Sequence, residues 1–331
     1  MFTARLLVFV ALSGSFSAVS VFGGTGGSAW APGVSMEKGW IDVNKAHVPY
    51  SWEDAVAVGG GNDLSMTDKS MCWAAQSANM LQYWQNMYVA SGRTLATGTP
   101  DGFVVGRETA TRRQYQIFEH FVSNWTDMGG SSTYGIPWYL CGGFFSDYPT
   151  GVLWSECFGG MDKGGFFTDI YPTAGDLNWV DFRSFTYTHQ NTEQSFTDVK
   201  GFSDVLIGCF KNLNAVVGLN VYLKNNSTSG EVKHALTVWG CDYDAAGMIT
   251  KIYLTDSDDG EVGLKTVSVQ SGSDGKLYLS GYSETETARI QDFSMLSVNK
   301  FLVSVPEPSA FGLLAGLAGI FFAGTRRRHR S

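Results

Sequence analysis

One segment constrains this chain most: a cysteine followed by a long, uninterrupted run of small and apolar residues. From Trp73 to Tyr88 these residues recur at helical spacing, with much alanine and neither Pro nor Gly, which predicts a buried helix. Cys72 directly precedes the run. The first-turn N–H groups and the positive end of the helix dipole favour the nucleophilic thiolate there. An inert cysteine in a core helix is the alternative interpretation.

A β-hairpin is predicted in the second half of the chain. Residues 234–242 and 249–255 are apolar and β-branched, and the stretch 244–247 has turn composition. With the turn centred near Ala245 or Ala246, the position numbers of cross-strand partners sum to about 490 to 492. Further elements expected are a helix over 202–213 and a strand over 215–223, whereas residues 129–185 read as rich in loops and aromatic residues.

This register brings together two residue types that acid–base chemistry needs. His234 is expected to face Asp256 or its neighbours, where a carboxylate can accept an imidazole N–H and fix its tautomer. The stretch from Asp256 to Gly260, which includes Asp258, also fits a simple turn or a cation loop. Taken with Cys72, these residues indicate a cysteine peptidase.

Both ends of the chain carry features of export. Arg5, an apolar run over 6–12 and mostly small residues over 13–20 predict a signal peptide at 1–20. At 305–331 a Pro-Glu-Pro motif is followed by an uncharged stretch and an arginine cluster. This order resembles the PEP-CTERM sorting tail, which implies exosortase-like sorting machinery, transient membrane association and a cell-surface or extracellular location. An ordinary tail anchor is the alternative.

Between these ends, the glycine-rich segment 21–37 is interpreted as a flexible lead-in and 38–304 as one domain. The formal net charge is −8, and about −12 if residues 1–20 and 305–331 are removed. Such an acidic balance argues against nucleic acid as a partner, because binding phosphates needs clustered Lys and Arg.

The five cysteines leave several states open in an exported chain. Cys72 is the candidate free thiol. The other four, Cys141, Cys157, Cys209 and Cys241, allow three pairings, of which Cys141 with Cys157 is the most local. Buried reduced thiols are the alternative.

Several blocks, in order from about residue 39 to 280, resemble a known family. They are Gly39–Lys45, Cys72–Ala75, Asn79–Leu81, Tyr83–Trp84, His234–Gly240, Asp242–Asp244 and Ile252–Asp258. They are similar to the streptococcal immunoglobulin G-degrading cysteine endopeptidases of the IdeS/Mac type. The resemblance implies a papain-like α+β fold, with the cysteine at the start of a buried helix and the histidine and aspartate on a hairpin of an antiparallel sheet.

Matched position by position, the resemblance implies roles for five residues. Cys72 would be the nucleophile, His234 the general base and then acid, and Asp256 the residue that orients the histidine. Asp258 would be a supporting carboxylate, and Lys45 would stabilise the oxyanion beside the Cys72 backbone N–H. No metal or organic cofactor is needed for this chemistry.

Two departures from the family stand near these residues. Trp73 occupies a position that is glycine in the streptococcal enzymes, and extra residues that include 59–61 separate Lys45 from Cys72.

The expected function is thus that of an exported cysteine endopeptidase acting on a protein or peptide. Two alternatives stay open. One is a catalytically silent surface-binding or biofilm-matrix protein, and the other is a thiol acyltransferase or amidase, since acyl transfer uses the same thioester.

Overall fold

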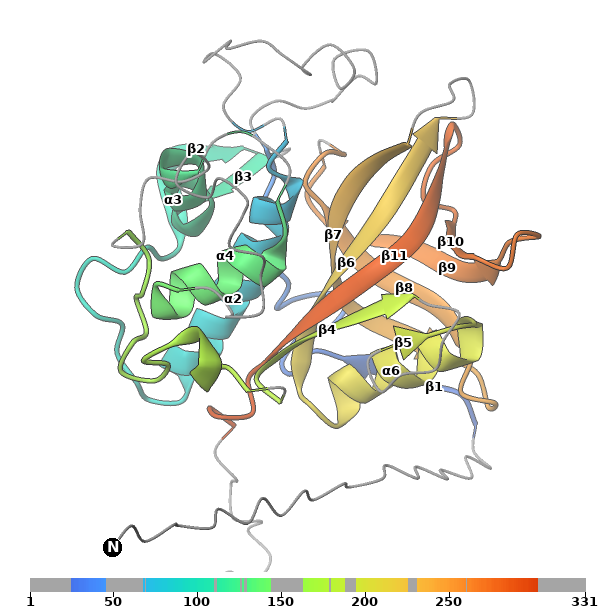
Figure 1. Ribbon diagram of the computed structural model, residues 1–331, viewed down its shortest axis with the longest axis horizontal. Helices are drawn as coiled ribbons and strands as arrows, with labels where there is room; N and C mark the ends of the chain where they lie inside the picture. The colour runs from blue at the N-terminus through green and yellow to red at the C-terminus, as the bar shows by residue number, and fades with distance from the viewer. Residues whose placement is uncertain are drawn as a thin grey trace, which may run out of the picture.

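Antiparallel strands dominate the molecule, with helices packed on two sides (Figure 1). The computed structural model describes residues 25–45, 68, 70–109, 112–125, 127, 130–143, 163–178, 180–187, 195–225, 231–259 and 261–302. The helices are α2 (Cys72–Ala90), α3 (Gln116–Asn124), α4 (Ser132–Cys141) and α6 (Val199–Lys211), with a short 3-10 turn at Ala174–Asp176.

Six strands pair in a closed ring. They are β6 (Ala215–Asn225), β7 (Glu231–Tyr243), β8 (Ile249–Asp256), β9 (Lys265–Ser271), β10 (Leu277–Ser280) and β11 (Glu286–Ser297). Each pairs antiparallel with the next, and β11 pairs back to β6. The predicted papain-like α+β fold class is therefore wrong: the strands form a closed six-stranded antiparallel barrel. The closing pair, β6 with β11, joins segments far apart in sequence, which hydrophobic patterning does not reveal.

Other strands extend the sheet or lie apart from it. β1 (Gly27–Trp30) pairs with β7, while β4 (Phe182–Tyr187) pairs with β11 and, in parallel, with β5 (Ser195–Phe196). β2 (Phe103–Thr109) and β3 (Arg112–Tyr115) form a separate hairpin.

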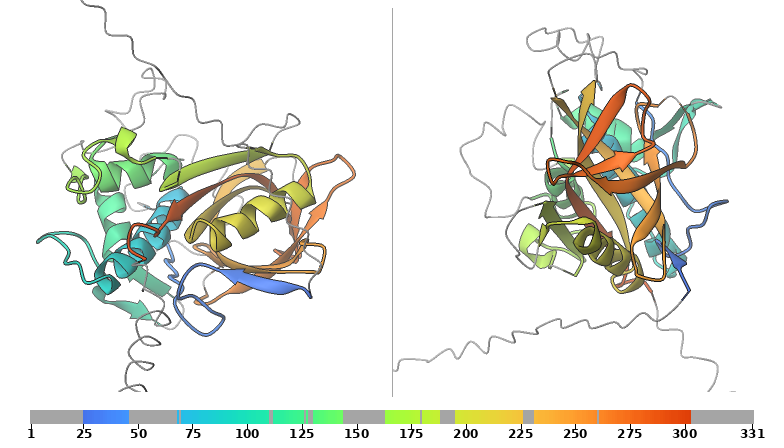
Figure 2. Two further views of the ribbon diagram at one scale, coloured as in Figure 1. Left: turned by 90° about the horizontal axis from the view of Figure 1, so that it is seen from below. Right: turned by 90° about the vertical axis from the view of Figure 1, so that its right-hand side faces the viewer.

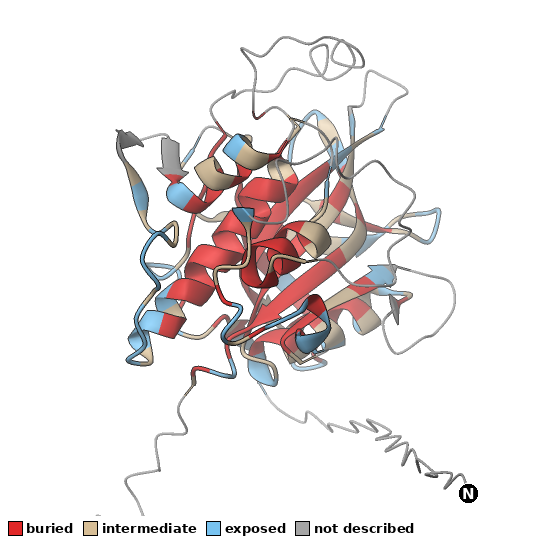
Figure 3. Ribbon diagram, turned by 60° about the vertical axis from the view of Figure 1, so that its left-hand side comes forward, coloured by how far each residue is buried: buried red, intermediate tan, exposed pale blue. Residues whose placement is uncertain are grey.

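The helices cover the barrel from two directions (Figure 2). α2 packs against β6, β7 and β11 on one side and against α3 and α4 on the other, so it is buried along most of its length (Figure 3). α6 packs against β1, β6, β8 and β9. α2 packs on one face of β7 and the closed barrel encloses the other, so the residues from His234 to Cys241 are buried without interruption.

Most local elements agree with the predictions. The helix after Cys72, the helix near 202–213 and the strands on either side of the 244–247 turn all form. Residues 132–141, in the stretch interpreted as loop-rich, instead form α4 with Pro137 inside it. Residues 27–30, in the expected lead-in, form β1, so folded structure begins before Lys38.

The predicted signal peptide at 1–20 and sorting tail at 305–331 lie outside the described residues. Among the helices that the structure does describe, none combines the length and the apolar character needed to cross a membrane.

Candidate active site

Cys72 is the first residue of α2, where the helix meets the barrel, and its side chain is partly exposed. The main-chain N–H groups of Ala74 and Ala75 both donate to Met71, which leads into the helix. The next side chain, Trp73, is buried and packs edge-on against Phe121 of α3 and against Trp125. The large residue that replaces the family glycine thus anchors the start of α2, and it leaves the thiol beside it accessible.

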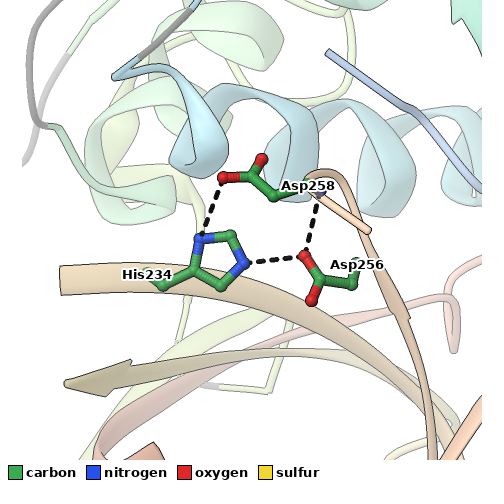
Figure 4. A group of neighbouring side chains, drawn as sticks. All are labelled: His234, Asp256 and Asp258. Carbon is green, nitrogen blue, oxygen red and sulfur yellow. Dashed lines mark hydrogen bonds and ion pairs between the residues drawn. The ribbon is translucent and has the colours of Figure 1, made fainter. Parts of the chain in front are cut away.

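His234, on β7, is buried beneath the helix start and lies between two carboxylates (Figure 4). Its Nε2 is 2.7 Å from Oδ1 of Asp256, at the end of β8. Its Nδ1 is 3.8 Å from Oδ2 of Asp258. Cys72 lies close enough to His234 to help raise the pKa of its imidazole. The three residue types expected to act together therefore meet in one place.

Beside the site the hairpin register lies at the upper limit of the predicted range, and after an irregularity between Val238 and Gly240 it lies one residue beyond that range. Asp256 is directly opposite Leu236, whereas His234 pairs on its other edge with Val221. His234 is thus two positions before Leu236, the residue opposite Asp256, and on the same face of β7. Its side chain therefore reaches Asp256 diagonally across the two strands.

Burial and charge act in opposite directions on this pair. Burial alone would lower the pKa of His234, but the charges of Asp256 and Asp258 and the hydrogen bonds to Asp256 and Cys72 hold it well above its usual value. Burial likewise favours the neutral form of Asp256, yet His234 and the other donors hold its pKa well below the usual range. Both effects favour an ionised imidazolium–carboxylate pair.

Lys45 is buried at 1 % exposure and its Nζ is 2.9 Å from Oδ1 of Asp258. Burial by itself lowers the pKa of this lysine, but Asp258 and Cys72 outweigh that effect and raise it. On composition alone Lys45 reads as a surface lysine. The structure instead brings it into electrostatic contact with Cys72, and Asp258 is shared between Lys45 and His234.

The segment that carries Lys45 is held by main-chain contacts to α2 and to the loop after β8. The N–H of Lys45 donates to the carbonyl of Ser257, and the N–H of Val43 donates to the side chain of Asn79 on α2 at 2.9 Å. The amide of Asn79 also donates to Thr237 of β7 at 3.0 Å. One buried amide therefore ties together the three elements that supply Lys45, Cys72 and the neighbourhood of His234.

Gln76, one turn after Cys72, fastens α2 to the barrel. Its amide donates to the carbonyls of Leu219 on β6 and Leu236 on β7, at 3.2 and 2.8 Å. A Cβ at Gly218 would lie 2.6 Å from the Gln76 side chain, so only glycine allows this close approach. The hydrogen bonds of Gln76 and Asn79 thus fix the position of α2, and with it Cys72, relative to β7.

The remaining described cysteines are buried free thiols. Burial raises the pKa of Cys141 to about 11, and those of Cys209 and Cys241 to about 12. This matches the reduced-thiol alternative for Cys209 and Cys241. Cys157, the expected partner of Cys141, lies outside the described residues.

His234, Asp256 and Asp258 offer ligand atoms within 4.8 Å of one another, so they could hold a metal ion. Each group already has a partner within this site, however. Lys45 neutralises Asp258 and the imidazole itself bridges toward both carboxylates. A divalent ion would have to displace these contacts.

Two further residues complete the surroundings of Asp256 and were not predicted. Tyr282, just after β10, donates its hydroxyl to Oδ2 of Asp256 at 2.7 Å, and Nζ of Lys265 lies 3.6 Å from the same oxygen. Neither stands in a motif, and both reach Asp256 only because β9 and β10 follow β8 around the barrel.

Two comparisons relate this chain to known proteins. The Mac-1 family model matches residues 203–292, which include His234, Asp256 and Asp258 but neither Cys72 nor Lys45. An IgM protease of Streptococcus suis is 24 % identical over 270 residues, or 76 % of this chain. The chain spans only 20 % of that relative's length. The predicted resemblance to the IdeS/Mac family is confirmed.

Proposed function

We propose that this chain is a cysteine endopeptidase in which Cys72 is the nucleophile, His234 the base and then acid, and Asp256 the orienting carboxylate. The observation that carries the proposal is the buried 2.7 Å contact between His234 Nε2 and Asp256, with Cys72 at the start of α2 close enough to act on the pKa of the imidazole. A nucleophile, a base and an orienter in hydrogen-bonded sequence are the parts that thiol acyl transfer requires.

The reaction begins with a Cys72 thiolate beside a His234 imidazolium. The sulfur attacks the carbonyl carbon of a peptide bond, and His234 gives its proton to the leaving amine, which departs with one half of the substrate. A thioester remains on Cys72. Neutral His234 then takes a proton from water as the water oxygen attacks the thioester carbonyl carbon. The C–S bond breaks, the carboxylic acid leaves, and the Cys72 thiolate stands again beside the His234 imidazolium.

Lys45 and Asp258 have supporting roles in this proposal. A buried ammonium in electrostatic contact with Cys72 is suited to stabilise the oxyanion that forms during the attack. Asp258 holds that ammonium at 2.9 Å and adds negative charge near the imidazole.

We further propose that residues 27–304, which include β1, act as the enzyme, exported by the segment 1–20 and carrying a sorting tail at 305–331. The substrate is then a protein or peptide met outside the cell. The streptococcal relative is named for cleavage of IgM, whereas this chain is assigned only the reaction class, hydrolysis of peptide bonds.

The test is the rate of Cys72 alkylation by iodoacetamide near neutral pH, followed by intact mass and peptide mapping. The other described thiols are buried with a raised pKa, so they are expected to react slowly. Cys72→Ala should abolish the fast label, and His234→Ala should slow it. Cys157→Ser serves as the control for the fifth cysteine.

Fast, single-site labelling that depends on His234 supports the proposal and justifies a peptide-library search for cleavage. The search should include an added amine, because a transferase would form the amide instead of the acid. Labelling of Cys72 no faster than a free cysteine, with or without His234, overturns the proposal and favours the surface-binding alternative.

A further inference from the structure

The proposed mechanism uses only one oxygen of Asp256, and the structure gives the other oxygen two partners of its own. We propose that Tyr282 and Lys265 are positioning residues, which hold the Asp256 carboxylate through Oδ2 so that Oδ1 stays on His234. This inference rests on the proposed function, since its purpose is to keep the imidazole aimed at Cys72.

Tyr282 supplies the directional contact. It follows β10 and is buried, with its hydroxyl 2.7 Å from Oδ2 of Asp256. Burial, and then the charge of Asp256, raise the pKa of Tyr282 well above its ordinary value. The phenol therefore stays protonated, and remains a donor, at neutral pH.

Lys265 supplies charge. It is the first residue of β9, opposite Leu254 of β8, and its Nζ lies 3.6 Å from Oδ2 of Asp256. The same ammonium stands 4.7 Å from the centre of the Tyr282 ring and 3.8 Å from Asp259. Its side chain is 28 % exposed. Lys265 thus reaches the buried carboxylate from the solvent side and covers the tyrosine that binds it.

Both carboxylate oxygens of Asp256 therefore have partners. Oδ1 accepts from His234 at 2.7 Å and from the N–H of Asp258 at 3.1 Å, while Oδ2 faces Tyr282 and Lys265. A carboxylate with partners on both oxygens cannot rotate about its Cβ–Cγ bond without breaking a buried hydrogen bond. Partners on Oδ2 also draw negative charge away from Oδ1. They therefore make Asp256 a weaker base toward the imidazole than a free carboxylate would be.

This last effect has a definite sign. Loss of either partner should leave more negative charge on the His234 side, so the pKa of His234 should rise further. At the same time the freed carboxylate should orient the imidazole less well, and Cys72 should react more slowly. A residue that only filled space in the core would change stability without moving the titration of His234.

The chain contains a matched control on the β9–β10 hairpin. Tyr278 donates to Oδ2 of Asp274 at 2.8 Å, and Lys276 lies 3.8 Å from that oxygen, but this group is exposed and stands apart from His234. Tyr278→Phe and Lys276→Met therefore make the same chemical changes as Tyr282→Phe and Lys265→Met outside the site.

The experiment follows the ring ¹⁵N shifts of His234 against pH in the folded protein, assigned with His234→Gln, and measures Cys72 alkylation beside it. Tyr282→Phe and Lys265→Met are expected to raise the titration midpoint of His234 by about half a unit to one unit. Alkylation should slow roughly fivefold to tenfold. Lys265→Arg should keep the His234 titration midpoint and the Cys72 alkylation rate at their wild-type values. The hairpin controls, Tyr278→Phe and Lys276→Met, should also match the wild type.

An unchanged or lowered midpoint in both site variants, in protein that unfolds cooperatively, overturns the inference. Failure of the proposed function looks different: Cys72 of the wild type would show no activation, whatever the His234 titration does. Because Lys265 is partly exposed, Lys265→Met gives a folded readout even if Tyr282→Phe destabilises the core.

Discussion

Two aspartates on neighbouring parts of the sheet have nearly the same partners and opposite surroundings. Asp256 accepts from Tyr282 at 2.7 Å, and Asp274 accepts from Tyr278 at 2.8 Å. The side chain of Asp256 is 2 % exposed, however, whereas that of Asp274 is 43 % exposed. The tyrosine hydrogen bond alone does not distinguish a site from a surface turn.

Burial separates the two groups chemically. Around Asp256 water is excluded, so the imidazole of His234 and the ammonium of Lys265 act through a medium that screens charge weakly. Around Asp274 the contacts with the N–H of Lys276 and with Tyr278 lower the pKa of the carboxyl, but solvent screens the ion pair. The comparison teaches that coupling between protonation states depends on the surroundings more than on the partners.

The largest expected contrast comes from removing the charge at each aspartate. Asp256→Asn leaves a buried imidazolium without its carboxylate, so Cys72 reactivity and any peptide cleavage should fall about 10²-fold to 10⁴-fold. The free energy of unfolding should drop by about 3 kcal/mol. Asp274→Asn should change neither. Alkylation kinetics and urea unfolding measure both, and equal effects at the two positions would break the comparison.

The pH dependence of the free energy of unfolding tests the buried pair of His234 and Asp256 next. The folded-state pKa of His234 is raised, so its stabilising contribution is complete below about pH 6.5 and is lost as pH rises toward the folded value. The wild type should lose about 1 kcal/mol per pH unit in that alkaline window relative to His234→Gln. Urea unfolding from pH 6 to 10 tests this, and parallel curves for the two proteins would contradict it.

A smaller effect is expected at Lys45, because its partner Asp258 is 20 % exposed and water offsets part of the loss. Lys45→Met should lower the free energy of unfolding by about 2 kcal/mol and slow peptide cleavage through the lost oxyanion charge. Lys276→Met is the exposed control and should behave as wild type in thermal unfolding. An unchanged melting temperature for Lys45→Met would mean that the buried ion pair contributes no net stability.

The smallest effect is local. Oδ1 of Asp274 accepts the N–H of Lys276 at 3.1 Å, so Asp274→Ala should speed hydrogen exchange at that amide severalfold and leave the melting temperature unchanged. Hydrogen exchange at the other described amides of β9 and β10 is the internal control. Faster exchange spread through the barrel would show that this hairpin is coupled to the core after all.

The local elements near the site were predictable from short-range patterns. Alanine-rich periodicity after Cys72 predicts α2, and the alternation around the 244–247 turn predicts the hairpin that carries His234 and Asp256. α4 was missed because Gly135 and Pro137 disfavour a helix, although the buried packing of Trp138 and Tyr139 overrides that preference.

What the sequence by itself determined is the chemistry on offer: a cysteine at a helix start, a histidine and aspartates on one hairpin, and a resemblance to the IdeS/Mac family. The tertiary structure alone decided that the strands close into a barrel, that Lys45 is buried against Asp258, and that Tyr282 and Lys265 meet at Asp256. The physical reason is that helices and hairpins follow from neighbours in the chain. Barrel closure and the burial of charge depend on contacts between distant segments, and the local pattern carries no record of them.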